Sequence, residues 1–86
     1  MDLSDFKLIS FTQRVRLLRE KGNYLATRTL ENYYIKLYTI KGIYFEVWSS
    51  SYLPWENIVK VKVFKDYSML KPYLPEIYFA DNKLSL

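Results

Sequence analysis

Hydrophobic and polar residues alternate most clearly in the middle of the chain, between Tyr33 and Trp48. Alternation with a period of two is typical of β-strands, because successive side chains point to opposite faces of a sheet. The dipeptide Lys41-Gly42 interrupts this alternation and indicates a tight turn. The segment therefore predicts a β-hairpin of two antiparallel strands, which is the centre of the predicted fold.

The register of this hairpin is predicted by pairing apolar residues with apolar residues, since a slip of one residue turns a strand inside out. A two-residue loop would pair Leu37 with Glu46, so it is not expected. A three-residue loop, Ile40 to Gly42, places glycine where such a loop needs a left-handed residue. The predicted pairs are Leu37 with Phe45 and Ile35 with Val47 on the inner face, and Tyr38 with Tyr44, Lys36 with Glu46 and Tyr34 with Trp48 on the outer face.

A helix is predicted from Ser10 to Lys21. Ser10 and Gln13 have the spacing of a capping box, in which each side chain bonds the backbone N–H of the other residue. Gly22 is expected to end the helix in the left-handed conformation. The apolar stripe of this helix consists of Phe11, Val15 and Leu18.

The remaining segments predict short elements around the helix and the hairpin. Met1 to Ile9 is compatible with either an irregular arm or a first helical turn. The serine-rich loop after the hairpin contains Tyr52, Leu53 and Trp55, which are large for a solvated loop, so it is expected to fold back onto the domain. The other predictions are a strand at Tyr24–Leu30, a turn at Glu31-Asn32, a strand at Ile58–Lys65, a short helix at Ser68–Tyr73 capped by Asp66 or Ser68, and an edge strand or arm at Glu76–Ala80.

Together these elements predict a single α+β domain spanning residues 1–86. An N-terminal helix packs on a three- to four-stranded antiparallel β-meander, and a short C-terminal helix or arm follows. The helix is expected to cover a sheet face that bears Ile35, Leu37, Phe45, Val47, Val59, Val61 and Val63. The candidate interaction face is the opposite one, with Tyr34, Lys36, Tyr38, Tyr44, Glu46, Trp48, Lys60, Lys62 and Phe64.

An open aromatic face of this kind is larger than a monomer usually exposes, so a cover is expected. Three covers are compatible with the sequence: the segment around Tyr73 and Tyr78, a second copy of the chain, or another partner. Tyrosine supplies nine of the aromatic residues, which make up 19% of the chain. Tyr and Trp are enriched at protein interfaces, which favours the second and third possibilities.

Composition argues against catalysis and against a metal or cofactor site. The chain has no histidine and no cysteine, which removes the commonest general base, the commonest metal ligands and any disulfide. Its two glycines, Gly22 and Gly42, are too far apart for a phosphate-binding loop. A general-acid role for Glu46 needs a raised pKa, and Lys36 in the predicted position opposite would lower it. No enzymatic activity, metal or cofactor is predicted.

The leading hypothesis is a non-enzymatic protein-interaction module that forms a homodimer through the aromatic face. The alternative is binding of single-stranded nucleic acid through the same Tyr, Trp and Lys side chains, since rings stack on bases and cations attract phosphates. The net charge of +4 suits an anionic partner but is also ordinary for a small soluble domain. A small-ligand or enzyme role would require an enclosed pocket, for which Tyr52 and Trp55 are the candidate walls.

The sequence favours a cytoplasmic protein without a membrane partner. No run of apolar residues is long enough to span a bilayer. The first residues are acidic and lack the order of charged and apolar residues found in a signal peptide.

Part of the chain, from Gly22 to Phe64, resembles a group of short uncharacterised bacterial proteins. The residues that carry the resemblance are Gly22, Tyr24, Leu25, Arg28, Tyr33, Ile35, Leu37, Tyr38, the run Phe45 to Trp48, Ile58 and Val61. The resemblance implies a small bacterial protein, and it brings no activity, ligand or site residue.

Overall fold

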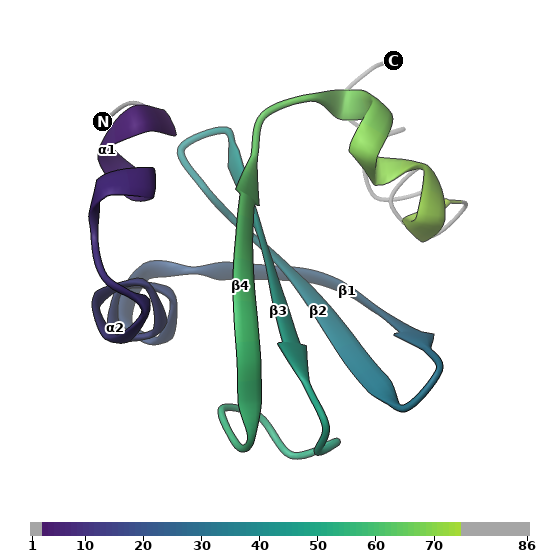
Figure 1. The fold of residues 1–86 in the computed structure, drawn as a ribbon. Helices are drawn as coiled ribbons and strands as arrows, with labels where there is room; N and C mark the ends of the chain where they lie inside the picture. The colour runs from purple at the N-terminus through teal and green to yellow at the C-terminus, as the bar shows by residue number, and fades with distance from the viewer. Residues whose placement is uncertain (1–2, 75–86) are drawn as a thin grey trace.

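The computed structural model describes residues 3–74 of the chain, and it confirms the α+β fold class (Figure 1). The four strands form one antiparallel sheet in the order β1-β2-β3-β4, as a meander. No helix among these residues has the length and apolar character needed to span a membrane. The elements are α1 (Leu3–Leu8), α2 (Phe11–Lys21), β1 (Asn23–Leu30), β2 (Tyr33–Ile40), β3 (Ile43–Ser49), β4 (Ile58–Phe64) and the 3-10 helix η1 (Tyr67–Tyr73). The predicted strand or arm at Glu76–Ala80 lies outside the described residues.

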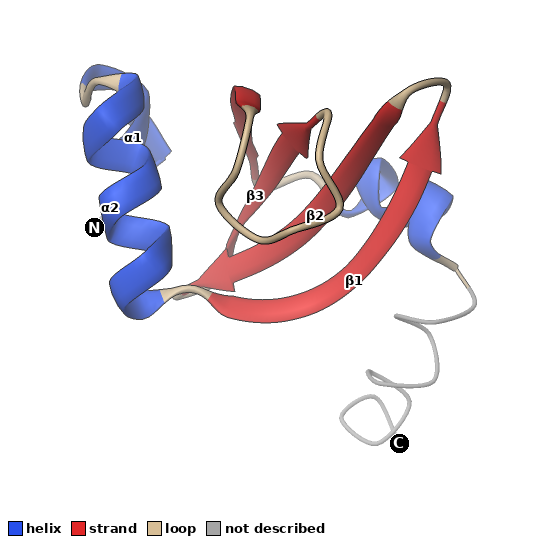
Figure 2. Cartoon of the chain, turned by 90° about the horizontal axis from the view of Figure 1, so that it is seen from below, coloured by secondary structure: helices blue, strands red, loops and turns tan. Residues whose placement is uncertain are grey.

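Both faces of the sheet carry a covering helix. Helices α1 and α2 lie on one side and η1 lies on the other (Figures 1 and 2). The buried residues on the α2 side are Phe6, Leu18, Tyr38, Ile40, Ile43, Phe45, Val47 and Val61. Those on the η1 side are Ala26, Ile35, Leu37, Trp48, Phe64, Leu70 and Tyr73. Helix η1, which includes Tyr73, thus covers part of the second face, as the sequence allowed, whereas the residues around Tyr78 lie outside the described ones.

The start of helix α2 follows its sequence signal, whereas its end does not. The Ser10 side chain accepts a hydrogen bond from the Gln13 backbone at 3.1 Å, and the Gln13 side chain accepts one from the Ser10 backbone at 2.9 Å. Gly22 has φ −72° and ψ 138°, so the predicted left-handed cap is wrong. Glycine is needed there for space instead, because a Cβ atom would lie 2.7 Å from the carbonyl oxygen of Leu18.

The predicted register of the central hairpin is wrong by one residue. The turn has two residues, Lys41 and Gly42, with φ of 50° and 80°, and Ile40 pairs with Ile43. Two left-handed residues are what a type I′ turn requires. The remaining pairs are Thr39 with Tyr44, Tyr38 with Phe45, Leu37 with Glu46, Lys36 with Val47, Ile35 with Trp48 and Tyr34 with Ser49.

The corrected register redistributes the predicted core. Ile35 and Leu37 were expected beside Phe45, but they lie on the η1 side while Phe45 lies on the α2 side. A shift in register between Trp48 and Ser49 also affects the adjacent strand β4. There Val59 is 52% exposed, although it was expected in the core.

Candidate functional site

The nine residues of the predicted interaction face lie on both sides of the sheet. Because side chains alternate along each strand, the register separates them into two groups. Tyr34, Lys36 and Tyr38 lie on the α2 side; Tyr44, Glu46, Trp48, Lys60, Lys62 and Phe64 lie on the η1 side. The single aromatic face expected from the sequence is therefore absent from the described fold.

Glu46 lies at the centre of a buried polar cluster on the η1 side and is only 2% exposed. Its carboxylate accepts hydrogen bonds from Arg28 Nη2 at 3.3 Å, Tyr73 Oη at 2.5 Å and Trp48 Nε1 at 3.4 Å. Lys36, the predicted partner of Glu46, lies on the other face. Burial and the hydrogen bond to Glu46 raise the pKa of Tyr73. The cluster joins η1 to β1 and β3, so it holds η1 on the sheet.

Trp48 is largely covered by cationic side chains rather than open to a partner. The Lys60 Nζ atom lies 4.0 Å from the Trp48 ring centroid, and the Lys62 Nζ atom lies 5.6 Å away. Arg28 approaches the same ring at 5.7 Å. Trp48 also belongs to the hydrophobic cluster on the η1 side and contacts the Tyr33 ring, so this predicted site residue contributes to packing.

On the α2 side, the loop between β3 and β4 folds back over β2, as its large residues predicted. Lys36 Nζ donates a hydrogen bond to the Tyr52 carbonyl oxygen at 2.9 Å. The Trp55 ring stacks on the Tyr38 ring with centroids 5.2 Å apart and an interplanar angle of 29°. Trp55 has φ 64°, which is uncommon for a bulky residue. The loop therefore holds this indole in place at the cost of backbone strain.

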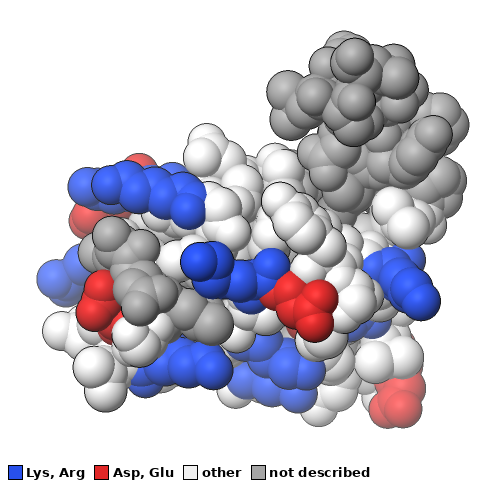
Figure 3. Space-filling view, turned by 90° about the horizontal axis from the view of Figure 1, so that it is seen from above, with Lys and Arg blue, Asp and Glu red and all other residues white. Residues whose placement is uncertain are grey.

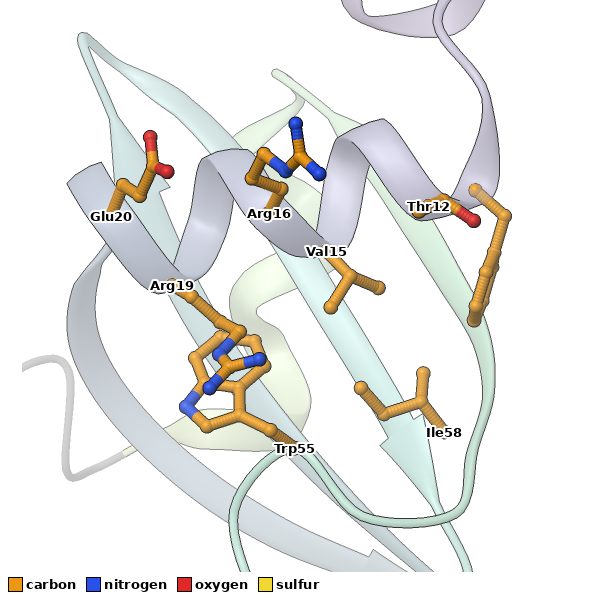
Figure 4. A pocket seen from close by; sticks show the side chains of 8 residues that line it. Thr12, Val15, Arg16, Arg19, Glu20, Trp55 and Ile58 are labelled. Atoms are coloured by element: carbon orange, nitrogen blue, oxygen red, sulfur yellow. The ribbon is translucent and has the colours of Figure 1, made fainter.

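Two open hollows meet at the stacked Trp55 and Tyr38 rings. The larger, about 750 Å³, lies between α2 and the loop (Figure 4). It is lined by Phe11, Thr12, Val15, Arg16, Arg19, Glu20, Trp55 and Ile58. The smaller, about 380 Å³, is lined by Tyr24, Thr27, Lys36, Tyr38, Tyr52 and Pro54. We refer to the residues of both hollows together as the Trp55 surface.

Exposed rings and arginines are combined on the Trp55 surface. Tyr24 is 56% exposed and Tyr52 is 67% exposed. Arg16 and Arg19 project from α2, and Arg19 and Trp55 point toward the same part of the larger hollow (Figure 4). In the described part of the chain neither arginine binds a carboxylate, and Glu20 is the one acidic residue in the lining.

Positive charge is dispersed on the face seen in Figure 3. Its Lys and Arg side chains form separate groups, with uncharged surface and acidic residues between them. The arginines of the Trp55 surface form a local group of positive charge in the same hollow as an aromatic ring.

Sequence reasoning identified only part of this surface. Lys36 and Tyr38 were predicted as site residues, and Tyr52 and Trp55 were noted as large for a loop. Tyr24, Arg16 and Arg19 were missed, because they come from separate elements and no spacing in the sequence relates them to the loop. Arg28 gave no signal either, since its partner Glu46 is 18 residues away along the chain.

Within residues 3–74, no group of three or more Asp, Glu, His or Cys side chains is placed to hold a metal ion. Comparisons of the chain with protein-family models, curated proteins and solved structures found no match. The chemistry of the Trp55 surface is that of planar rings and guanidinium groups, which are suited to binding planar and anionic groups.

Proposed function

We propose that the protein is a non-enzymatic module that binds single-stranded nucleic acid on the Trp55 surface. The observation that carries the proposal is the position of the half-buried Trp55 ring beside Arg19, which has no carboxylate partner in the described chain (Figure 4). The exposed rings of Tyr24 and Tyr52 line the adjoining hollow. Proteins that bind single strands combine aromatic side chains, on which bases stack, with cations that neutralise the backbone. The sequence suggested this function for a partly different set of residues, of which Lys36 and Tyr38 belong to the Trp55 surface and the other seven do not.

A single strand fits these residues better than a duplex does. The ring of Trp55 is half-buried at the junction of two hollows, so only a base released from its own stack can lie against it. Bases in unpaired segments are free to turn outward and stack on aromatic side chains.

Each group has a distinct role in this proposal. Trp55, Tyr52 and Tyr24 stack on bases, and each stacked base contributes about 1–3 kcal/mol. Arg16 and Arg19 neutralise phosphates. For two phosphates the logarithm of the association constant falls by about 1.4 for each tenfold rise in salt, so binding weakens about 25-fold.

The Trp55 surface is poorly suited to pairing with a second copy of itself. A two-fold axis places the same surface on both partners. A surface that carries Arg16, Arg19 and Lys36, with Glu20 as the one acidic residue of its lining, would then lie against an equally positive surface. Like charges in contact disfavour such an assembly.

Fluorescence anisotropy of a labelled oligothymidine tests the proposal. Trp55→Ala should weaken binding about 5- to 150-fold, as expected for the loss of one stacked base. Tyr67→Ala is the matched control, because Tyr67 is also an exposed ring, 73% accessible, but lies on η1. The affinity of Tyr67→Ala for oligothymidine should equal that of the unaltered protein.

An abasic oligonucleotide of the same length separates stacking from simple charge attraction. The proposal requires that it binds much more weakly than oligothymidine at equal salt. Equal binding of the two strands, or equal loss of affinity in Trp55→Ala and Tyr67→Ala, would contradict it.

A further inference from the structure

The sheet is open, and its two edge strands differ in protection. At the β4 edge, Arg14 Nη1 donates to the Val61 carbonyl oxygen at 3.0 Å. The same guanidinium donates from Nε to the Phe6 carbonyl oxygen at 3.1 Å and from Nη2 to that of Lys7 at 3.2 Å. Arg14 thus ties the backbone of α1 to this edge and occupies an outward-facing backbone acceptor.

Within residues 3–74, the β1 edge has no comparable protection. Among residues 3–74 its neighbours are β2 and η1, and no element lies beyond it in the sheet (Figures 1 and 2). Exposed edge strands usually carry proline, charged side chains or a β-bulge, which prevent pairing with another chain. The one register shift of β1, between Tyr24 and Ala26, lies before the segment from Thr27 to Thr29. Strand β1, Asn23–Leu30, contains no proline, lysine or acidic residue. Its one charged residue, Arg28, is turned to Glu46.

The backbone groups available at this edge follow from the register. Leu30 and Tyr33 flank a two-residue turn and form a hydrogen-bonded pair. Because such pairs alternate along an antiparallel ladder, Arg28 also faces β2, whereas the N–H and C=O groups of Thr27 and Thr29 point outward. The same alternation on β4 turns the Val61 carbonyl outward, where Arg14 binds it.

We propose that a second copy of the chain pairs with β1 in the antiparallel sense, with the two-fold axis at Arg28. Thr27 of each copy then faces Thr29 of the other, and each pair exchanges both of its backbone hydrogen bonds. With the two-fold axis at Thr27 or Thr29 instead, only one outward-facing residue of the regular strand would form both of its backbone hydrogen bonds. The register shift between Tyr24 and Ala26 interrupts the ladder on one side, and the turn ends it on the other. The result is a continuous sheet across both copies.

The side chains along this segment are compatible with pairing to themselves. Thr–Thr contacts across strands are favourable, and the charge of Arg28 is offset by Glu46 in each copy. Leu30, which is 44% exposed, gains a covering neighbour. With the axis perpendicular to the sheet, the Trp55 surfaces of both copies face the same side. The pairing itself does not depend on what that surface binds.

Light scattering with charged substitutions tests this pairing. The unaltered chain should have about twice its mass of 10.4 kDa. Thr27→Lys together with Thr29→Lys places like charges opposite each other in both pairs and should give a monomer. Thr27→Lys together with Thr29→Glu places opposite charges there and should keep the dimer. Circular dichroism checks that both double variants fold.

This pair of variants distinguishes pairing from a general effect on folding, because both alter the same two positions. A mass of 10.4 kDa for the unaltered chain at about 100 μM would overturn the proposal, since a contact with a Kd near 10 μM is mostly formed there. Dimers of equal strength in both double variants would place the interface elsewhere and overturn it as well. Neither outcome depends on the presence of an oligonucleotide.

Discussion

Replacing Arg28 by methionine tests whether the buried Glu46 carboxylate depends on its ion pair. Methionine keeps much of the length and apolar surface of the arginine side chain but removes the charge. The two side chains differ in exposure, 22% for Arg28 and 3% for Glu46. Arg28→Met therefore leaves a carboxylate away from water with hydrogen bonds from Tyr73 and Trp48 alone.

The expected loss is large for a domain of this size. Removing one partner of a buried ion pair costs about 3–5 kcal/mol, and the partial exposure of Arg28 favours the lower end, about 3 kcal/mol. An 86-residue domain has a free energy of unfolding of roughly 4–13 kcal/mol. The urea midpoint should fall by about 2 M for a slope of roughly 1.5 kcal/mol per M.

A double-mutant cycle with Glu46→Gln provides the control. Glutamine keeps an acceptor for the Tyr73 hydroxyl but carries no charge, so the buried carboxylate that makes Arg28→Met costly is gone. The double variant should therefore be less destabilised than the sum of the single variants, with a coupling of about 1–3 kcal/mol measured by urea unfolding. Additive losses would refute the conclusion that Arg28 stabilises the fold by neutralising Glu46.

Two further predictions concern the same fold. Because the pKa of Tyr73 is raised, the unfolded chain releases the phenol proton at lower pH than the folded chain does. The contribution of the protonated Tyr73 hydroxyl to the free energy of unfolding is therefore complete below about pH 10 and is lost as pH rises through the pKa of the folded state. Urea unfolding across this alkaline range should show a smaller decline for Tyr73→Phe, and equal declines would contradict the burial of this hydroxyl. Gly22→Ala should lower the free energy of unfolding by about 1–3 kcal/mol, because the new methyl group meets the Leu18 carbonyl oxygen despite an ordinary φ. An unchanged thermal midpoint in Gly22→Ala would contradict this expectation, because it would show that the end of α2 moves to accommodate the methyl group.

The order of the elements was predictable because its signals are local. The Ser10–Gln13 capping box marked the start of α2, and alternation marked the strands from Tyr24 to Phe64. These signals involve residues that are neighbours along the chain, so they act before tertiary contacts are considered.

The hairpin register was not predictable in the same way. The prediction excluded a Leu37–Glu46 pair because a carboxylate beside buried leucine requires compensation. That compensation is present but comes from Arg28 and Tyr73, which are 18 and 27 residues away from Glu46. A rule based on neighbouring strands cannot include partners supplied by other elements.

The Trp55 surface was hidden for a related reason. Its residues come from α2, β1, β2, β4 and the loop between β3 and β4, so no single periodic pattern contains them. The large residues of the loop indicated that it folds back, but its contact with Tyr38 became evident only in the structure.

Fluorine NMR of protein labelled with 5-fluorotryptophan decides whether nucleic acid binds against Trp55. The chain has two tryptophans, Trp48 and Trp55, and Trp55→Phe assigns the two signals without altering the protein that is titrated. Addition of oligothymidine should shift the Trp55 signal and leave that of Trp48, only 8% exposed, nearly unchanged. A Trp55 signal that stays fixed while the oligonucleotide binds would contradict the account.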